Sequence, residues 1–257
     1  MRSLTRALGF LSIAPMGNLA HFETGQIPLM LAAFPLAGAI LGAALGAFWH
    51  VLNLFLDAQL SAAITVCAWA TLTRGFHLDG LADCADGLGG GFTPEARLKI
   101  MKDPHIGAFG TIAIVGVLLV KYSALTALSA HPLPFAFPEQ GKLIRGVVWF
   151  ALIVSAARFG MLCGMVGARY ARADGGLGKD FFPAAKPWVL LAAAPVPLAL
   201  ALLCGRERGL IVVAVPVAIA LLFRLLVNRM LRGLTGDTLG AMVELGELGA
   251  LISALFV

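Results

Sequence analysis

Three aspartates with helical spacing are the strongest chemical signal in this 257-residue sequence. Asp79, Asp83 and Asp86 stand at i, i+4 and i+7, so on a continuous helix they fall within about 60° of one another. Three like charges this close repel, and a divalent cation removes that repulsion. Carboxylate oxygens are the ligands that magnesium prefers. We therefore predict magnesium binding here, in preference to a solvated acidic helix end paired with Lys and Arg.

A second acidic set lies near the C-terminus. Asp237, Glu244 and Glu247 stand at i, i+7 and i+10, within about 80° on a helix. Two glutamates inside an apolar span need partners, and Thr235 or Asp237 can cap the helix that carries them. We expect the two acidic helices to face each other, so that the second set completes or orients the metal site. Snorkelling of these side chains to the membrane interface is the alternative.

The remaining candidates are a histidine and several basic residues. His77 precedes Asp79 by two positions, which leaves open a packing or capping role and a role as base or substrate contact. Positively charged side chains suit phosphate binding, and a second polar segment with Gly175-Gly176-x-Gly178 offers a flexible loop, a weak signal by itself. The predicted substrate-binding residues are Arg97, Lys102, Asp103, His105, Arg169 and Lys179.

The elements that position these residues are predicted to be membrane helices. Hydrophobic residues make up 60% of the chain, charged residues only 13%, and mean hydropathy is +0.91. We expect an all-α transmembrane bundle of about six or seven spans, forming one integral-membrane catalytic domain over residues 1–257 in a lipid bilayer. The candidate spans are 27–56, 58–76, 106–130, 143–167, 188–204, 209–231 and 238–257.

Loop charge predicts the orientation of this bundle. With the N-terminus in the cytoplasm, thirteen of the nineteen Lys and Arg residues lie on the cytoplasmic side, and eleven of the fourteen acidic residues share that face. This convergence places the predicted active site at the cytoplasmic face of a bacterial inner membrane. The net charge of +5 is explained by orientation, and we expect no nucleic-acid partner. Arg158 falls inside a span and must face the bundle interior, where pairing with a carboxylate and a catalytic role are equally open.

The motifs together resemble the cobalamin synthase family, the adenosylcobinamide-GDP ribazoletransferases, from about Phe10 to the C-terminus. The matching segments are Gly75-Phe-His-Leu-Asp-Gly-Leu-Ala-Asp83, Ile100-Met-Lys-Asp103, Arg169-Tyr-Ala-Arg172, Thr235-Gly-Asp-Thr-Leu-Gly240 and Glu244-Leu-Gly-Glu247. One departure is His105, at a position where the family often has a second arginine.

The resemblance implies a magnesium-dependent phosphotransferase. Its substrates are adenosylcobinamide-GDP and α-ribazole or α-ribazole 5′-phosphate, its products are adenosylcobalamin or its 5′-phosphate together with GMP, and the step belongs to nucleotide loop assembly in vitamin B12 biosynthesis. Magnesium ligands are then Asp79, Asp83, Asp86, Asp237, Glu244 and Glu247, and the hydroxyl proton goes to Asp86, Glu244 or His77.

Three alternatives follow from the same residues. A phosphatidyl or other alcohol phosphotransferase would use the same metal chemistry with a lipid acceptor. A cation transporter would place its carboxylates near mid-span at the interface of repeats, whereas here they gather toward one face. If the protein were a non-catalytic membrane subunit, the two acidic sets would have no explanation. The sequence leaves the lower-ligand base, the number of metal ions and a homo-oligomer open.

Overall fold

The chain folds into a bundle of α-helices in the computed structural model, which describes residues 2–14, 23–130, 141–172, 175–176 and 178–256. The elements are α1 (Arg2–Leu11), η2 (Thr24–Gln26), α2 (Ile27–Ala32), α3 (Phe34–Phe55), α4 (Ala58–Leu72), α5 (Phe76–Gly90), α6 (Pro94–Ile100), α7 (Ala108–Ala130), α8 (Lys142–Met165), α9 (Phe181–Ala184), α10 (Pro187–Ala193), α11 (Pro195–Leu203), α12 (Glu207–Leu231) and α13 (Gly236–Ser253). The predicted all-α class is confirmed for these residues.

Within the described residues, four helices are long and apolar enough to cross a membrane. They cover Phe34–Phe55, Ala108–Ser129, Leu143–Met165 and Glu207–Leu231, and two shorter apolar stretches cover Ala58–Leu72 and Pro187–Leu203. The predicted span over 27–56 is divided between α2 and α3, and the one over 188–204 between α10 and α11. Pro35 and Pro195 each stand in the first turn after the division, where a proline's missing N–H leaves no hydrogen bond unmade.

Helix α3 packs closely on α8 through the glycine face that the sequence shows. A Cβ atom added at Gly38 would lie 2.9 Å from the carbonyl oxygen of Val154, and one added at Gly42 would overlap the carbonyl oxygen of Phe150. Gly46 meets Gly146 in the same way, at 2.7 Å. Small residues let two helix backbones approach where lipid supplies no hydrophobic drive for association.

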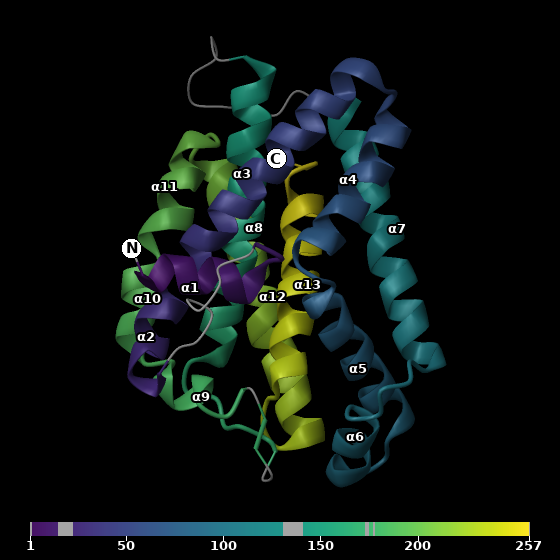
Figure 1. Ribbon diagram of the computed structural model, residues 1–257, viewed down its shortest axis with the longest axis vertical. Helices are drawn as coiled ribbons and strands as arrows, with labels where there is room; N and C mark the ends of the chain where they lie inside the picture. Colours follow the sequence, from purple (N-terminus) through teal and green to yellow (C-terminus); the bar gives the residue numbers. More distant parts are fainter. Residues whose placement is uncertain (1, 15–22, 131–140, 173–174, 177, 257) are drawn as a thin grey trace.

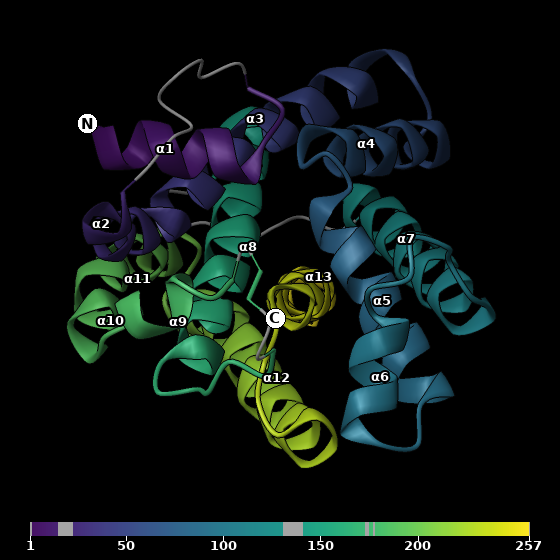
Figure 2. The same cartoon turned by 60° about the horizontal axis from the view of Figure 1, so that its bottom comes forward.

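Helix α13 lies at the centre of the bundle. Figure 2 shows it almost end-on, with α5, α7, α8 and α12 around it, and it contacts all four. Helix α1 lies across the long helices instead of along them (Figure 1) and buries Ala7, Gly9 and Leu11. The two acidic helices, α5 and α13, are neighbours.

Candidate functional site

The site is built where α5 passes α13. Gly80 is the point of closest approach, because a Cβ added there would lie 2.8 Å from the carbonyl oxygen of Asp237 and 3.1 Å from its Cα. Asp79 and Asp83 stand on either side of this contact along α5. The structure thus brings together Asp79, Asp83 and Asp237, here called the aspartate cluster, and the two acidic helices face each other as predicted.

Asp237 is held at the beginning of α13. Thr235 is the N-cap and forms a capping box with Thr238, and its hydroxyl also donates to Asp237 at 3.2 Å. Arg172 donates to the same carboxylate oxygen, with 2.6 Å between its Nη2 and Asp237 Oδ2. The N-terminal end of a helix favours negative charge, so Asp237 has both a cation and a helix end beside it.

The aspartate cluster carries more negative charge than its partners balance. Partial burial, together with the negative charges of Asp237 and Asp79, raises the pKa of Asp83 to about 7. Burial also raises the pKa of Asp237, although Arg172 opposes that shift. A carboxyl whose pKa is raised by neighbouring negative charges marks a place that a further cation would stabilise.

Asp86, the third predicted ligand on α5, lies in a different environment. Its two oxygens accept the backbone N–H groups of Gly107 at 2.7 Å and Gly110 at 2.9 Å. These groups are at the beginning of α7, where backbone N–H groups have no partner within the helix. The structure therefore uses Asp86 to attach α5 to the end of α7, and its predicted roles as ligand and proton acceptor stay predictions.

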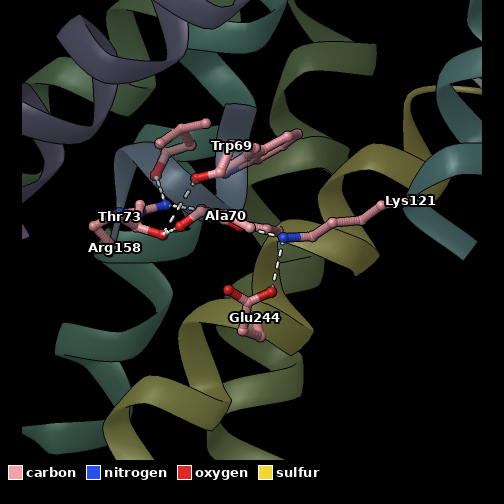
Figure 3. A network of polar contacts seen from close by, with 8 residues as sticks. Trp69, Ala70, Thr73, Lys121, Arg158 and Glu244 are labelled. Carbon is pink, nitrogen blue, oxygen red and sulfur yellow. Dashed lines mark hydrogen bonds and ion pairs between the residues drawn. The ribbon is translucent and has the colours of Figure 1, made fainter. Parts of the chain in front are cut away.

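Glu244 and Glu247 lie deeper in the bundle and are paired with two cations. Lys121 of α7 donates to Glu244 at 2.8 Å and to Glu247 at 2.6 Å, and Arg158 of α8 forms an ion pair with Glu247. Figure 3 shows Lys121 and Glu244 pointing toward one another, and the ammonium of Lys121 lies 4.5 Å from the ring centre of Trp69. We call Lys121, Arg158, Glu244 and Glu247 the buried ion-pair network.

This network answers the question left open for Arg158, which is 0% exposed and contacts a carboxylate. Two positive and two negative charges balance within it. Lys121 and Arg158 thus occupy the glutamates that the sequence assigns to the metal. No group of three or more His, Cys, Asp or Glu side chains in the described ranges is already arranged to hold a metal ion, and the ligand roles of Glu244 and Glu247 stay predictions.

His77 points inward from the first turn of α5. It is 3% exposed, and its Nδ1 has no hydrogen-bond partner among the residues that the structure describes. Burial lowers the pKa of the imidazole to about 3, so the ring is neutral. It lines an apolar cavity of about 60 Å³ with Phe76, Gly236 and Gly240. Its role as proton acceptor stays a prediction.

The predicted phosphate-binding residues lie on segments around the aspartate cluster. Arg97 donates to the carbonyl oxygen of Met230 at 3.1 Å, which ties α6 to the end of α12. Asp103 accepts from His105 Nδ1 at 2.8 Å and from its backbone N–H at 3.0 Å. Asp103 therefore orients His105, and these hydrogen bonds lower the pKa of the exposed carboxyl. Lys102 is exposed on the same turn.

The segment after α8 reaches the beginning of α13. The backbone of Arg169 accepts from Leu234 at 2.8 Å, and Ala171 donates to Leu234 at 2.8 Å. This pairing places Arg172 against Asp237. The side chains of Arg169 and Lys179 are exposed, and the hydroxyl of Tyr170 donates to Gly175 at 3.2 Å, which holds the glycine loop. The substrate roles of Arg169 and Lys179 stay predictions.

Arg172 is the site residue that reasoning from the sequence missed. One signal could have found the neighbourhood: the pattern Arg-Gly-x-x-x-Asp occurs twice, at Arg74–Asp79 and at Arg232–Asp237. Both arginines have left-handed backbones, with φ +56° and +60°, and both follow the end of a long helix. A left-handed arginine thus precedes each acidic helix, but the turns differ, because α5 begins directly after the left-handed Gly75 and α13 begins after the extended N-cap Thr235.

Comparison with known proteins shows which family the chain resembles. The family model described as Cobalamin-5-phosphate synthase matches residues 3–255. Relatives named adenosylcobinamide-GDP ribazoletransferase include one from Syntrophobacter fumaroxidans, 35% identical over 96% of both chains, and one from Desulfitobacterium hafniense, 36% identical over 99% of this chain and 96% of the relative.

A third relative of the same name, from Escherichia coli, is 37% identical over 93% of this chain and 90% of its own length. No solved structure matches the chain. The match extends over nearly every element that positions the aspartate cluster, including α1 and all of α13. The chain therefore belongs to the cobalamin-5-phosphate synthase family, whose relatives are named adenosylcobinamide-GDP ribazoletransferase.

Proposed function

We propose that this protein transfers the cobinamide-phosphate group of adenosylcobinamide-GDP to α-ribazole or α-ribazole 5′-phosphate and releases GMP. Membership of the family carries this proposal, because the relatives named for the reaction match along almost the whole chain. The aspartate cluster supports it independently. When an alcohol attacks a pyrophosphate, charge must be neutralised at both phosphates and the nucleophile must be held in line. The aspartate cluster between the two helices is a charged site where both can occur.

Magnesium is proposed as the cofactor. The donor set fits it, since Asp79, Asp83 and Asp237 offer only carboxylate oxygens and their negative charge exceeds that of their cationic partners. Bound there, a magnesium ion would neutralise charge on the phosphate oxygens. The proposed ligand set also keeps Asp86, Glu244 and Glu247. In their present contacts, with the beginning of α7 and with the cations of the buried ion-pair network, they orient the helices that carry the aspartate cluster.

The chain's own residues then have defined tasks. Asp79, Asp83 and Asp237 would hold the magnesium ion from two helices, and Gly80 keeps these helices close together. Arg172, already against Asp237, is positioned to bind a phosphate oxygen when that carboxylate is engaged elsewhere. The proton of the attacking hydroxyl passes to one of the three predicted acceptors, His77, Asp86 or Glu244.

The exposed basic residues around the cluster would bind the pyrophosphate and the leaving GMP. Lys102 and His105 precede α7, and Arg169 and Lys179 belong to the segment that meets the beginning of α13. Arg97 is tied to α12 by its hydrogen bond to Met230. We propose a substrate role for these five residues and a positioning role for Asp103, which holds His105.

The proposed setting is a bacterial inner membrane with the site at the cytoplasmic face. The loop charges support this orientation. Among the described residues, four helices are long and apolar enough to cross a membrane, and with α4, the α10–α11 pair and α13 the proposed total is six or seven.

The test is GMP release by detergent-purified protein given adenosylcobinamide-GDP and either acceptor, with magnesium and with EDTA. We expect release only with magnesium, matched one to one by a cobalamin product. No turnover by folded protein would overturn the proposal, and turnover with a lipid alcohol in place of α-ribazole would assign the protein to the phosphatidyl transferase class.

A further inference from the structure

An open groove lies beside the aspartate cluster, between the end of α1 and the turn from α4 to α5. Its volume is about 650 Å³, and Asp79 of the aspartate cluster forms part of its wall. The lining residues are Gly9, Phe10, Arg74, Gly75, Phe76, Leu78, Asp79 and Ile114. Sites of this size take one small molecule, so the groove suits a nucleoside better than a corrin macrocycle.

Two aromatic rings form one wall of the groove. Phe10 and Phe76 meet edge to face with 5.6 Å between ring centres, and Phe76 is 41% exposed. Phe10 is backed by Phe34 at 5.8 Å and by Phe181 at 5.2 Å. This packing fixes the orientation of the wall. A fixed aromatic surface that is open on one side suits a planar heteroaromatic base, because every such base has a π-face to stack.

Arg74 stands at the mouth of the groove in a conformation that normally favours glycine. Its φ is +56°, and the bonds from Arg74 N to Thr71 O at 2.9 Å and from Gly75 N to Ala70 O at 2.8 Å end α4 in a Schellman motif. A non-glycine residue in the left-handed region is strained. One guanidinium nitrogen donates to Gly9 at 3.3 Å, and a guanidinium has five N–H donors.

We propose that this groove binds the acceptor nucleoside, with its base against Phe10 and Phe76, its ribose toward Asp79 and a 5′-phosphate at Arg74. The inference rests on the proposed function and adds the acceptor site to it. The two charged residues have distinct tasks. Asp79 belongs to the proposed magnesium site, toward which the attacking hydroxyl would point, and Arg74 supplies the positive charge for a phosphate. The phosphorylated acceptor is therefore the better ligand.

The experiment measures equilibrium binding of α-ribazole and α-ribazole 5′-phosphate to purified protein without adenosylcobinamide-GDP. Phe76→Leu weakens both ligands about tenfold, because a stacking surface is lost. Arg74→Ala weakens only the phosphorylated ligand, by about 10- to 100-fold, and Arg74→Lys restores part of the loss. Arg206→Ala is the matched control, since Arg206 is exposed and also has a positive φ, +41°, at the beginning of α12.

If Arg74→Ala bound each of the two ligands as tightly as wild type does, the phosphate assignment would be overturned. If Phe76→Leu kept full affinity for both ligands, the base assignment would be overturned. Both outcomes leave GMP release by wild type intact, so they are distinct from a failure of the proposed function. The same measurements in nanodiscs of phosphatidylcholine, with and without phosphatidylglycerol, exclude a lipid source for the phosphate. Competition by phosphatidylglycerol that disappears in Arg74→Ala would assign the groove to a lipid headgroup instead.

Discussion

The same face of α13 carries two acidic regions that the structure treats in opposite ways. Near its beginning, Asp237 joins Asp79 and Asp83 in a half-exposed cluster with one cation, Arg172, against it. Two turns further, Glu244 and Glu247 are enclosed with Lys121 and Arg158. The first region has surplus negative charge, whereas the second is balanced.

The balanced region stabilises the fold, whereas the region with surplus negative charge is available for chemistry. An uncompensated charge in a bundle interior is strongly unfavourable, so the deep glutamates must be paired by residues of the chain. A half-exposed carboxylate is stabilised by water, so it needs no cationic partner from the chain and stays available to bind a ligand. We therefore expect substitutions in the buried ion-pair network to change stability and those in the aspartate cluster to change activity.

Glu247→Ala should have the largest effect on the free energy of unfolding. It leaves Arg158 buried without its ion-pair partner, and breaking a buried pair in this way costs about 3–5 kcal/mol. Thermal unfolding in detergent measures it. The control is the double variant Arg158→Met/Glu247→Leu, which removes both charges and keeps Lys121 with Glu244. A double variant as unstable as the single one would contradict the assignment of the cost to charge imbalance.

Asp83→Asn should have the reverse profile. We expect GMP release to fall by about 10²- to 10³-fold, the range for loss of one group that stabilises charge at a reacting centre, while the midpoint of thermal unfolding stays or rises because repulsion with Asp79 and Asp237 is relieved. Asp57→Asn is the matched control. Asp57 caps α4, and asparagine caps equally well. Equal loss of activity in both variants would remove the distinction between the two regions.

Gly80→Ala sharpens the comparison without changing any charge. The new methyl group would lie 2.8 Å from the carbonyl oxygen of Asp237, so α5 and α13 must separate. We expect about 1–3 kcal/mol of destabilisation, together with lower activity because the carboxylates of the two helices move apart. Gly116→Ala, where an added Cβ meets nothing within 4 Å, is the control. Full activity in Gly80→Ala would show that the spacing of the two helices is not critical.

Thr235→Ala should have the smallest effect. It removes the N-cap of α13 and the hydroxyl that donates to Asp237 at 3.2 Å. Loss of such a cap costs about 1 kcal/mol, and Thr235→Ser should restore it. The unfolding midpoint and GMP release are measured together. We expect Thr235→Ala to lower both the unfolding midpoint and GMP release, and Thr235→Ser to lower neither. If Thr235→Ala changed neither quantity, the cap would be dispensable.

Much of the fold and of the site follows from local pattern. The all-α class follows from apolar runs that only helices can present to lipid. The glycine face of α3 follows from its four-residue spacing, and its partner α8 was not predictable from the sequence. The division of α3 from α2 coincides with a proline, but the sequence alone does not say whether a proline bends a helix or ends it. Pro216 stays inside α12, whereas Pro35 and Pro195 follow breaks.

The sequence alone determined which carboxylates share a helical face, since Asp79 with Asp83 and Asp237 with Glu244 are related by spacing along one chain segment. It also determined the family. Only the tertiary structure decided the partner of each carboxylate: Arg172 for Asp237, the beginning of α7 for Asp86, and Lys121 with Arg158 for the two glutamates. The reason is that helix periodicity fixes directions within a segment, whereas charge compensation depends on helices that are distant in sequence and meet only in the packed bundle.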